Sequence, residues 1–381
     1  RSVSAAGDVN GDGFADLIVG APYAGEVGGA YVIFGNSAGF ASTLQMDSIN
    51  GTNGFFIQGV SSGDQVGLRV SSADINGDGR PDLIIGANQD DPAAGSNAGS
   101  TYVVFGSTSA FASTIEVASL DGSNGFIING AQAGEISGAA ISGLGDINGD
   151  GIEDLAIGAP NADSNVGRTY IVFGTSAGFS STLDLSTLNG TNGFVIKGYE
   201  ASGAVGRSVS AADMNGDGTN DIVLGGRYVD GPNGSEGELY VIYGGSGVGS
   251  SGTLNLQNLT GVDGVRMIGV TNNDNVGVSL FGGGDFNGDG KEDFIVGALN
   301  GDAGGSNTGE ASIVFGSTSF SDSGRPILVD DTLDGSIGFT VNGIAANDRS
   351  GGALASIGDV NGDGYEDFLI GARKADPGSG T

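Results

Sequence analysis

The stretch Asp8–Asp16, DVNGDGFAD, decides the fold because it returns five more times with its acidic residues in the same places. Each copy has Asp at position one, Asn at three, Asp at five, Gly at six and Asp at nine. The further copies begin at Asp74, Asp146, Asp213, Asp285 and Asp359. A short loop with oxygen-bearing side chains at this spacing gathers ligands around a hard cation such as Ca²⁺.

We expect the backbone carbonyl of position seven to be a further ligand. The side chain at this position varies widely among the copies, as a backbone ligand allows. An EF-hand needs a bidentate Glu at position twelve, but that position is apolar in all six copies, so we expect position nine to complete the shell. The expected ligands are Asp8, Asn10, Asp12, Phe14, Asp16, Asp74, Asn76, Asp78, Arg80, Asp82, Asp146, Asn148, Asp150, Ile152, Asp154, Asp213, Asn215, Asp217, Thr219, Asp221, Asp285, Asn287, Asp289, Lys291, Asp293, Asp359, Asn361, Asp363, Tyr365 and Asp367.

The alternative interpretation of these loops is a metal-free Asx-turn rich in Asp and Gly. Three carboxylates within a few ångströms repel one another without a counter-ion. We therefore expect about one Ca²⁺ per loop, with a structural role. At millimolar calcium and a dissociation constant near 0.1 mM, typical of extracellular modules, each site would stabilise the fold by roughly 1.4 kcal/mol.

The copies recur at intervals of about 70 residues, which with several short strands per unit is typical of propeller blades. The first unit has four candidate strands, at Ser2–Gly7, Leu17–Ala21, Ala30–Gly35 and Gly54–Gly59, here called strands A to D. The small residues of strand A suit the propeller axis, and the unbroken apolar run of strand B suits a strand covered on both faces. The sequence predicts an all-β fold, a β-propeller of four-stranded antiparallel blades.

Five blades are complete and the sixth is partial, with only strand A near 353–358 and strand B at Phe368–Ala372. The single propeller spans residues 1–381, and we expect it to be part of a longer chain with further domains. The blade boundaries lie approximately at 1–63, 64–134, 135–202, 203–273, 274–347 and 348–381.

Antiparallel alternation places the A–B and C–D loops on one face and the B–C and D–A loops on the other. The cation loops are A–B loops, so all six share a face. The B–C loops vary most in sequence, and variable loops on a rigid scaffold are where binding usually occurs. These loops are Pro22–Gly29, Asn88–Gly99, Asn161–Gly167, Arg227–Gly237 and Leu299–Gly309.

The loop followed by Gly-Ala-Pro, as at Gly20–Pro22, with an apolar residue and Gly before strand A, as at Val66-Gly67, resembles the FG-GAP repeat. This is the repeat of the integrin α-subunit β-propeller and its bacterial relatives. The resemblance implies seven blades, calcium in the A–B loops and binding through the opposite face. The Phe of the motif is replaced, and the uniform copies are more similar to bacterial FG-GAP proteins than to animal integrins.

Composition excludes several functional classes. The formal charge is −32, which disfavours nucleic acid and anionic membranes, and no apolar run is long enough to span a membrane. The chain has no Cys or His, so the GNSAG and GTSAG sequences at Gly35 and Gly174 cannot belong to a Ser-His-Asp triad and are interpreted as turns. The G-x-G-x-x-G at Gly247 precedes no helix pattern. The paired acids Asp90-Asp91 and Asp330-Asp331 are expected to be solvated, with an extra cation site as the alternative.

These observations predict a calcium-stabilised extracellular binding or adhesion module without catalysis of its own. It would hold a protein or glycan through its B–C and D–A loops, with Tyr23 and Tyr228 as candidate contacts. Calcium dependence and the absence of cysteine favour a bacterial exported or cell-surface protein. The alternatives are a non-catalytic propeller attached to a secreted hydrolase or lyase, such as a phospholipase D-like enzyme, and a structural spacer of a large surface protein.

Overall fold

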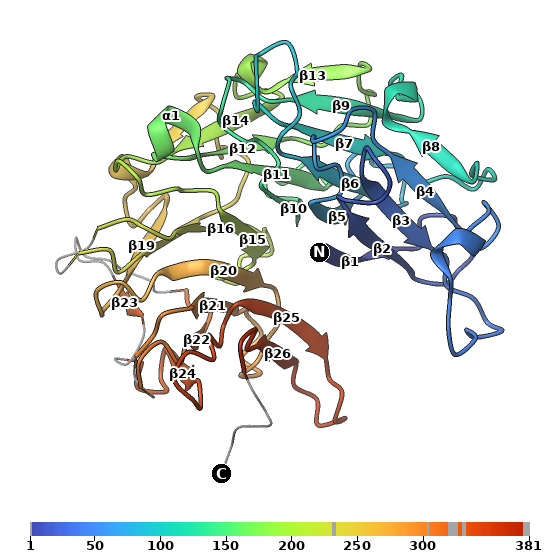
Figure 1. Cartoon of the computed structure of the whole chain (residues 1–381). Helices are drawn as coiled ribbons and strands as arrows, with labels where there is room; N and C mark the ends of the chain where they lie inside the picture. The colour runs from blue at the N-terminus through green and yellow to red at the C-terminus, as the bar shows by residue number, and fades with distance from the viewer. Residues whose placement is uncertain (1, 231–233, 303–304, 319–326, 330–332, 376–381) are drawn as a thin grey trace.

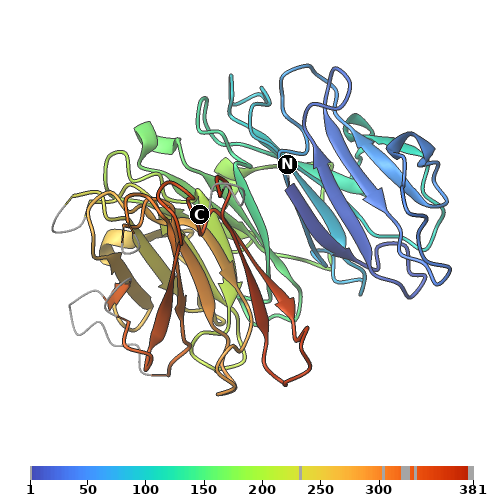
Figure 2. The same cartoon turned by 60° about the horizontal axis from the view of Figure 1, so that its bottom comes forward.

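The computed structural model describes residues 2–230, 234–302, 305–318, 327–329 and 333–375. Six β-sheets follow one another around an open arc, with the first and last sheets at its two ends (Figure 1). Seen after rotation, the sheets stand as separate blades, with the first blade at the right and the last hairpin in front near the middle of the view (Figure 2). This arrangement confirms the predicted all-β, blade-like architecture.

Each complete blade contains four antiparallel strands in chain order, as predicted. Strands A are β1 (Ser2–Gly7), β5 (Arg69–Ala73), β10 (Ala140–Gly145), β15 (Ser208–Ala212), β20 (Val276–Gly282) and β25 (Ala353–Gly358). Strands B are β2 (Asp16–Ala21), β6 (Asp82–Ala87), β11 (Asp154–Ala159), β16 (Asp221–Gly226), β21 (Phe294–Ala298) and β26 (Asp367–Gly371). Strands C are β3 (Gly29–Ile33), β7 (Ser100–Val104), β12 (Arg168–Val172), β17 (Glu238–Ile242) and β22 (Glu310–Val314). Strands D are β4 (Gly54–Gln58), β9 (Gly125–Asn129), β14 (Gly193–Lys197), β19 (Gly264–Gly269) and β24 (Gly338–Asn342).

The four-strand prediction omits a short fifth strand at the outer edge of the first four blades. This strand comes from the next repeat and pairs in parallel with strand D, so neighbouring repeats are joined by backbone hydrogen bonds. Three of its copies share a Thr followed by Leu or Ile, a signal visible in the sequence. The strands are β8 (Thr114–Glu116), β13 (Thr182–Asp184), β18 (Thr253–Asn255) and β23 (Ile327–Val329).

Helical structure in the described residues is limited to single turns. The 3₁₀ turns η2 (Val117–Ser119), η3 (Leu185–Thr187) and η4 (Leu256–Asn258) directly follow short edge strands, and η1 (Met46–Ser48) holds the equivalent place in the first repeat. The four-residue α1 (Ala162–Asn165) lies in a B–C loop. The described residues contain no helix that is long and apolar enough to cross a membrane.

The hydrophobic cores lie between blades, which explains the unbroken apolar runs of strands B. In β6, Leu83 and Ile85 pack into the core shared with the first blade, whereas Ile84 packs into the core shared with the third. All three side chains are fully buried. Because successive residues of a strand point to opposite faces, a strand between two blades must be apolar at every position.

The innermost position of strands A is also confirmed, because adjacent strands A contact one another directly. The Ser72 hydroxyl donates to the Ala5 carbonyl at 3.1 Å, and the Gly143 amide donates to the Ser71 hydroxyl at 3.2 Å. Larger side chains would hold these strands apart. Small residues therefore set the narrow spacing of the blades at the axis.

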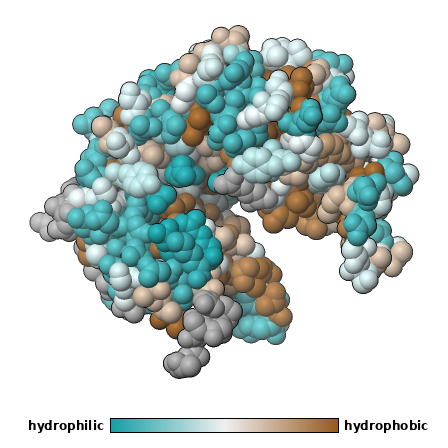
Figure 3. Space-filling view, viewed as in Figure 1, coloured by the Kyte–Doolittle hydropathy of each residue, from teal (hydrophilic) through white to brown (hydrophobic). Residues whose placement is uncertain are grey.

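Apolar side chains are exposed at both ends of the arc (Figure 3). Val3 and Leu17 are exposed on the first blade, and Ile357 and Leu369 are exposed on the last hairpin. The equivalent faces of the inner blades are buried against a neighbour. The end blades therefore present the same kind of surface that the other blades use for packing.

Candidate cation loops and ligand face

The predicted cation loops connect strands A and B in all six repeats, and their side-chain oxygens are held by the loop backbone. In the first loop, Asp8 accepts the amides of Asp12 and Gly13 through its two carboxylate oxygens, at 2.9 and 2.8 Å. The same two hydrogen bonds occur in the other five loops. Position one therefore closes each loop into the same compact turn.

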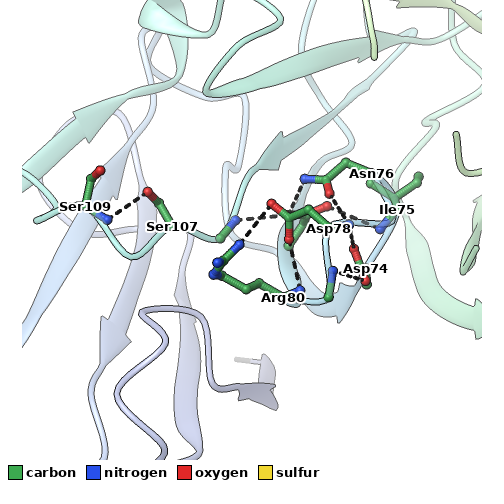
Figure 4. Close-up of polar contacts among 10 residues, drawn as sticks. Asp74, Ile75, Asn76, Asp78, Arg80, Ser107 and Ser109 are labelled. Carbon is green, nitrogen blue, oxygen red and sulfur yellow. Dashed lines mark hydrogen bonds and ion pairs between the residues drawn. The ribbon is translucent and has the colours of Figure 1, made fainter. Parts of the chain in front are cut away.

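Positions three and five add hydrogen bonds of the same kind. Asn10 Oδ1 accepts the Asp12 amide at 2.8 Å, and Asp12 Oδ1 accepts the Phe14 amide at 2.9 Å. These bonds also recur in every copy. Figure 4 shows them in the second loop, where Asp74, Asn76 and Asp78 gather over the turn. The backbone thus draws oxygens from positions one, three and five together.

Position nine has a different environment, because its carboxylate lies beneath the loop. Asp154 is fully buried, and its two oxygens accept the amides of Ile147 at 3.0 Å and Gly174 at 2.9 Å. The first of these amides is at position two of the loop, and the second lies just beyond strand C. The first five blades share this arrangement. Position nine therefore fastens the loop to the blade.

Burial changes the ionisation of these position-nine carboxyl groups. Desolvation raises the pKa of Asp154 to about 7, and repulsion from Asp150 and Asp146 adds to the effect, while the two amides act in the opposite direction. The same causes raise the pKa of Asp82 to about 8 and that of Asp221 to about 7. Three carboxyl groups in one loop therefore interact unfavourably unless a positive charge is present.

The donors suit calcium in kind, although no group of three acidic side chains in the described ranges stands in an arrangement that could hold a metal ion. The carboxylates instead engage the loop amides. An ionised carboxylate offers about four lone-pair sites, so an oxygen that accepts an amide retains capacity for a cation. If Ca²⁺ binds, the oxygens of positions one, three and five and the carbonyl of position seven would hold it, and the oxygens of position nine would contribute while still fastened to the backbone.

Positions seven and eight have a structural role that the sequence did not indicate: their side chains contact the loop of the preceding blade. A Cβ atom on Gly77 would lie 3.2 Å from the Ile152 side chain of the next loop, and one on Gly288 would meet the Tyr365 ring. At position eight, Glu153 accepts the Asp74 amide of the preceding loop at 2.8 Å. Consecutive cation loops are therefore in direct contact along one face of the arc.

Two loops carry a basic side chain at position seven that pairs with the carboxylate of position five. Arg80 Nη1 lies 3.3 Å from Asp78 Oδ2 (Figure 4). In the fifth loop, Lys291 Nζ lies 3.2 Å from Asp289 Oδ2. Both pairs are partly exposed, which limits their contribution to stability. They nevertheless place a positive charge where a divalent cation would bind, so the six loops are not electrostatically equivalent.

The A–B and C–D loops share a face, as antiparallel alternation predicts. A cavity of about 910 Å³ beside the second loop is lined by Asn76, Asp78 and Arg80 together with the C–D residues Ser107 and Ser109. The Ser107 amide also donates to the Val9 carbonyl of the first loop at 2.9 Å. The GNSAG and GTSAG sequences, which lie on this face, are in turns.

The opposite face, here called the upper face, carries the B–C and D–A loops. Tyr23 and Tyr228, the candidate contacts, are 69% and 40% exposed. The paired acids are not simply solvated, because Asp90 accepts the Tyr102 hydroxyl at 3.1 Å and Asp91 accepts the Asn97 amide at 2.7 Å. The second predicted pair, Asp330-Asp331, lies outside the described residues.

Buried acid–tyrosine pairs lie beneath the upper-face loops. Tyr170 donates its hydroxyl to Glu135 at 2.8 Å, and Tyr240 and Tyr199 both donate to Glu238. Burial raises the pKa of Glu135 and Glu238, although these hydrogen bonds partly oppose the shift. Such pairs fix the positions of the strands from which the upper-face loops emerge.

Glycines of adjacent blades touch where the two halves of the repeat motif meet. A Cβ atom on Gly158, which precedes Ala159-Pro160, would lie 1.9 Å from the carbonyl oxygen of Gly206 in the next blade. Gly206 itself has a φ of +82°, which a residue with a side chain rarely adopts. The chain belongs to the FG-GAP repeat family. The family model matches five segments that together span half of the chain, residues 1–39, 66–104, 137–172, 205–242 and 276–314.

Curated relatives of this FG-GAP chain include enzymes and integrins. It is 30% identical over 197 residues to phosphatidylinositol-glycan-specific phospholipase D from Bos taurus, an alignment that covers 51% of this chain and 22% of the relative. It is 28% identical over 211 residues to integrin alpha-4 from Xenopus laevis, covering 55% of this chain and 18% of the integrin. Integrin alpha-PS2 from Drosophila melanogaster is 35% identical over 130 residues, covering 32% of this chain and 9% of the integrin. The chain thus spans about a fifth or less of the length of these relatives.

Proposed function

We propose that this FG-GAP chain is a calcium-stabilised binding or adhesion module that acts outside the cell, presents its upper face to a protein or glycan and has no catalysis of its own. The observation that carries the proposal is the sixfold recurrence of one oxygen-rich loop on one face. Calcium in these loops would neutralise the clustered carboxylates and tighten the contact between consecutive blades. The variable loops of the opposite face remain available for a ligand.

The calcium part of the proposal is tested by isothermal titration calorimetry and thermal unfolding. We expect close to one Ca²⁺ per intact loop and a lower melting temperature in excess EGTA, because each site at ten times its dissociation constant stabilises the fold by about 1.4 kcal/mol. Mg²⁺ at the same concentration serves as the control. Absence of calcium binding, or an unchanged melting temperature in EGTA, would contradict a structural role for the metal.

The ligand-face part is tested by exchanging B–C loops. Replacing Pro22–Gly29 and Arg227–Gly237 by short Gly-Ser turns should abolish binding to a protein or glycan identified on an array, while leaving calcium binding intact. The matched control replaces the C–D turn at 36–39 on the cation-loop face. Loss of binding in the control, with binding retained in the B–C variant, would place the ligand on the cation-loop face and contradict the proposal.

A specific observation favours a second candidate, an accessory role beside a hydrolase or lyase. The phospholipase D relatives are enzymes by name, and this chain aligns with about a fifth of their length. Because the chain has no His or Cys, catalysis within it would fall to carboxylates, Tyr, Lys or metal-bound water. A catalytic domain in the full-length reading frame, together with hydrolase or lyase activity of that full-length protein, would support this alternative over a purely adhesive role or a structural spacer.

We also propose that the ring closes with seven blades, most simply within a longer bacterial surface or secreted chain. The exposed apolar side chains at both ends of the arc support this, because they match the surfaces that are buried between inner blades. A structure of the full-length protein tests the proposal. Two ends that stay solvent-exposed in that structure would contradict it.

A further inference from the structure

Basic residues are scarce in this chain, with 13 Lys and Arg against 45 Asp and Glu, yet four arginines gather on the upper face near the axis. Arg207 directly precedes β15 and Arg227 directly follows β16, so both lie at the upper end of the fourth blade. Arg349 lies just before β25 and Arg373 just after β26, at the same end of the last hairpin. Strands β15, β20 and β25 lie next to one another around the axis, which brings these strand ends together.

The guanidinium group of Arg227 is close enough to the other three arginines to be influenced by their charge. Burial lowers the pKa of Arg227, and the positive charges of Arg207, Arg373 and Arg349 lower it further. Like charges that converge in this way are unfavourable unless a negative charge lies between them. The cluster is therefore a place where a bound anion would relieve repulsion within the fold.

None of the four clustered arginines forms an ion pair with Asp or Glu in the part of the chain that the structure describes. Such ion pairs are formed by Arg80, Arg168, Arg266 and Lys291. Arg227 Nε donates only a long bond, 3.4 Å, to Asn275 Oδ1. Arg349 Nε is buried without a hydrogen-bond partner. In a chain of charge −32, Arg349 Nε therefore stays a buried donor without an internal acceptor, and Arg227 Nε has only a long neutral one.

The chemistry of the cluster favours a carboxylate on a sugar. A guanidinium group matches a carboxylate with two parallel hydrogen bonds. The Arg227 guanidinium lies 4.7 Å from the centre of the Tyr228 ring, and this exposed ring offers an apolar face on which a sugar ring can pack. The strongly negative chain disfavours a densely charged polyphosphate, whereas a saccharide with spaced carboxylates carries a lower charge density.

We propose that Arg207, Arg227, Arg349 and Arg373 form an anion-binding site on the upper face that holds the carboxylate groups of an acidic saccharide, with Tyr228 as the packing surface. The inference deepens the proposed function and rests on it for the choice of the ligand-binding face. The ligand class is uronic-acid-containing oligosaccharides, and it follows from the arginine cluster and Tyr228, not from the cation loops.

The test is calorimetric titration of the calcium-loaded protein with trigalacturonate, and with its fully methyl-esterified form as the neutral probe of the same shape. Sulfate and phosphate are titrated separately to distinguish a saccharide site from a simple anion site. The variants are Arg227→Gln and Arg349→Gln, and the control is Lys197→Gln on β14, which changes the net charge by the same amount. Circular dichroism confirms that each variant is folded.

We expect trigalacturonate to bind, the methyl ester not to bind, and each arginine variant to weaken binding at least tenfold, with less than a twofold change for Lys197→Gln. Equal weakening by all three variants would indicate long-range charge alone and overturn the proposal, as would sulfate or phosphate binding as tightly as the trisaccharide. No binding of trigalacturonate to the unaltered protein would also overturn it. If B–C loop exchange still abolishes binding of another ligand in that case, the proposed function stands without this site.

Discussion

Replacement of Asp154 separates the role of position nine in the fold from any role in metal binding. Its carboxylate accepts two amides, those of Ile147 and Gly174, and all three residues are buried. Alanine would leave two buried N–H groups without an acceptor, at about 1–3 kcal/mol each. Release of the desolvated carboxyl group, whose pKa is raised to about 7, offsets part of this cost. We therefore expect Asp154→Ala to destabilise the protein by roughly 2–4 kcal/mol even in EGTA.

The assay is urea unfolding in EGTA, followed by circular dichroism and by tyrosine fluorescence, which the absence of tryptophan makes usable. The matched control is Asp150→Ala in the same loop, where the exposed carboxylate accepts the Ile152 amide at 2.9 Å. In EGTA this control should lose less than about 1 kcal/mol, because water replaces an exposed acceptor. The reasoning would be refuted if Asp154→Ala were no more destabilised than Asp150→Ala without calcium.

Three further predictions concern the loops, the upper face and the blade contact. If the second loop binds Ca²⁺ as proposed, Arg80→Met should tighten that binding roughly three- to tenfold in titration calorimetry, since it removes a positive charge beside the expected ligand Asp78. Unchanged affinity would show that the ion pair does not compete with the cation. Glu135→Gln should change the pH dependence of stability. Burial raises the pKa of this carboxyl group in the folded state above its ordinary value near 4.5, so the native state binds a proton at a higher pH than the unfolded state does. The stability of the unaltered protein relative to the variant should therefore rise as the pH falls from 7 to 4.5. A difference in urea midpoint that does not change with pH would contradict the burial of Glu135. Gly158→Ala should lower the stability by more than about 2 kcal/mol, because the new methyl group would lie 1.9 Å from a backbone oxygen. The control Gly151→Ala has open space around it and should lower the stability by only about 1 kcal/mol, because of its backbone conformation. Equal shifts in melting temperature in EGTA would contradict the contact of Gly158 with the next blade.

Much of the fold follows from periodicity within a repeat. Strand A at Ser2–Gly7 agrees with β1 in both bounds, and strands B and D agree within a residue or so, because small residues, unbroken apolar runs and glycines mark them. The edge strands were missed because three residues such as Thr114–Glu116 are too short for a periodic signal. Their partner strand also belongs to the preceding repeat.

The candidate site was predictable in composition and less so in geometry. The acidic spacing located every loop, and alternation of antiparallel strands placed the loops on one face. The sequence could not show that Asp154 faces backbone amides, because this depends on how the A–B hairpin meets the end of strand C. It also could not show that Glu153 contacts a loop 79 residues away. The arginine cluster was missed for the same reason, since its members are separated in sequence and converge only at the axis.

The parallel edge strands have a practical consequence for anyone who divides this protein into fragments. The second blade of the sequence ends near residue 134, but its sheet is completed by β13, at Thr182–Asp184. A fragment cut at the sequence boundary would leave the outer edge of β9 with unpaired backbone groups, a template for aggregation. A fragment that keeps the outer edge of β9 paired must therefore extend about 50 residues into the following repeat, so that successive structural units overlap along the chain instead of meeting end to end.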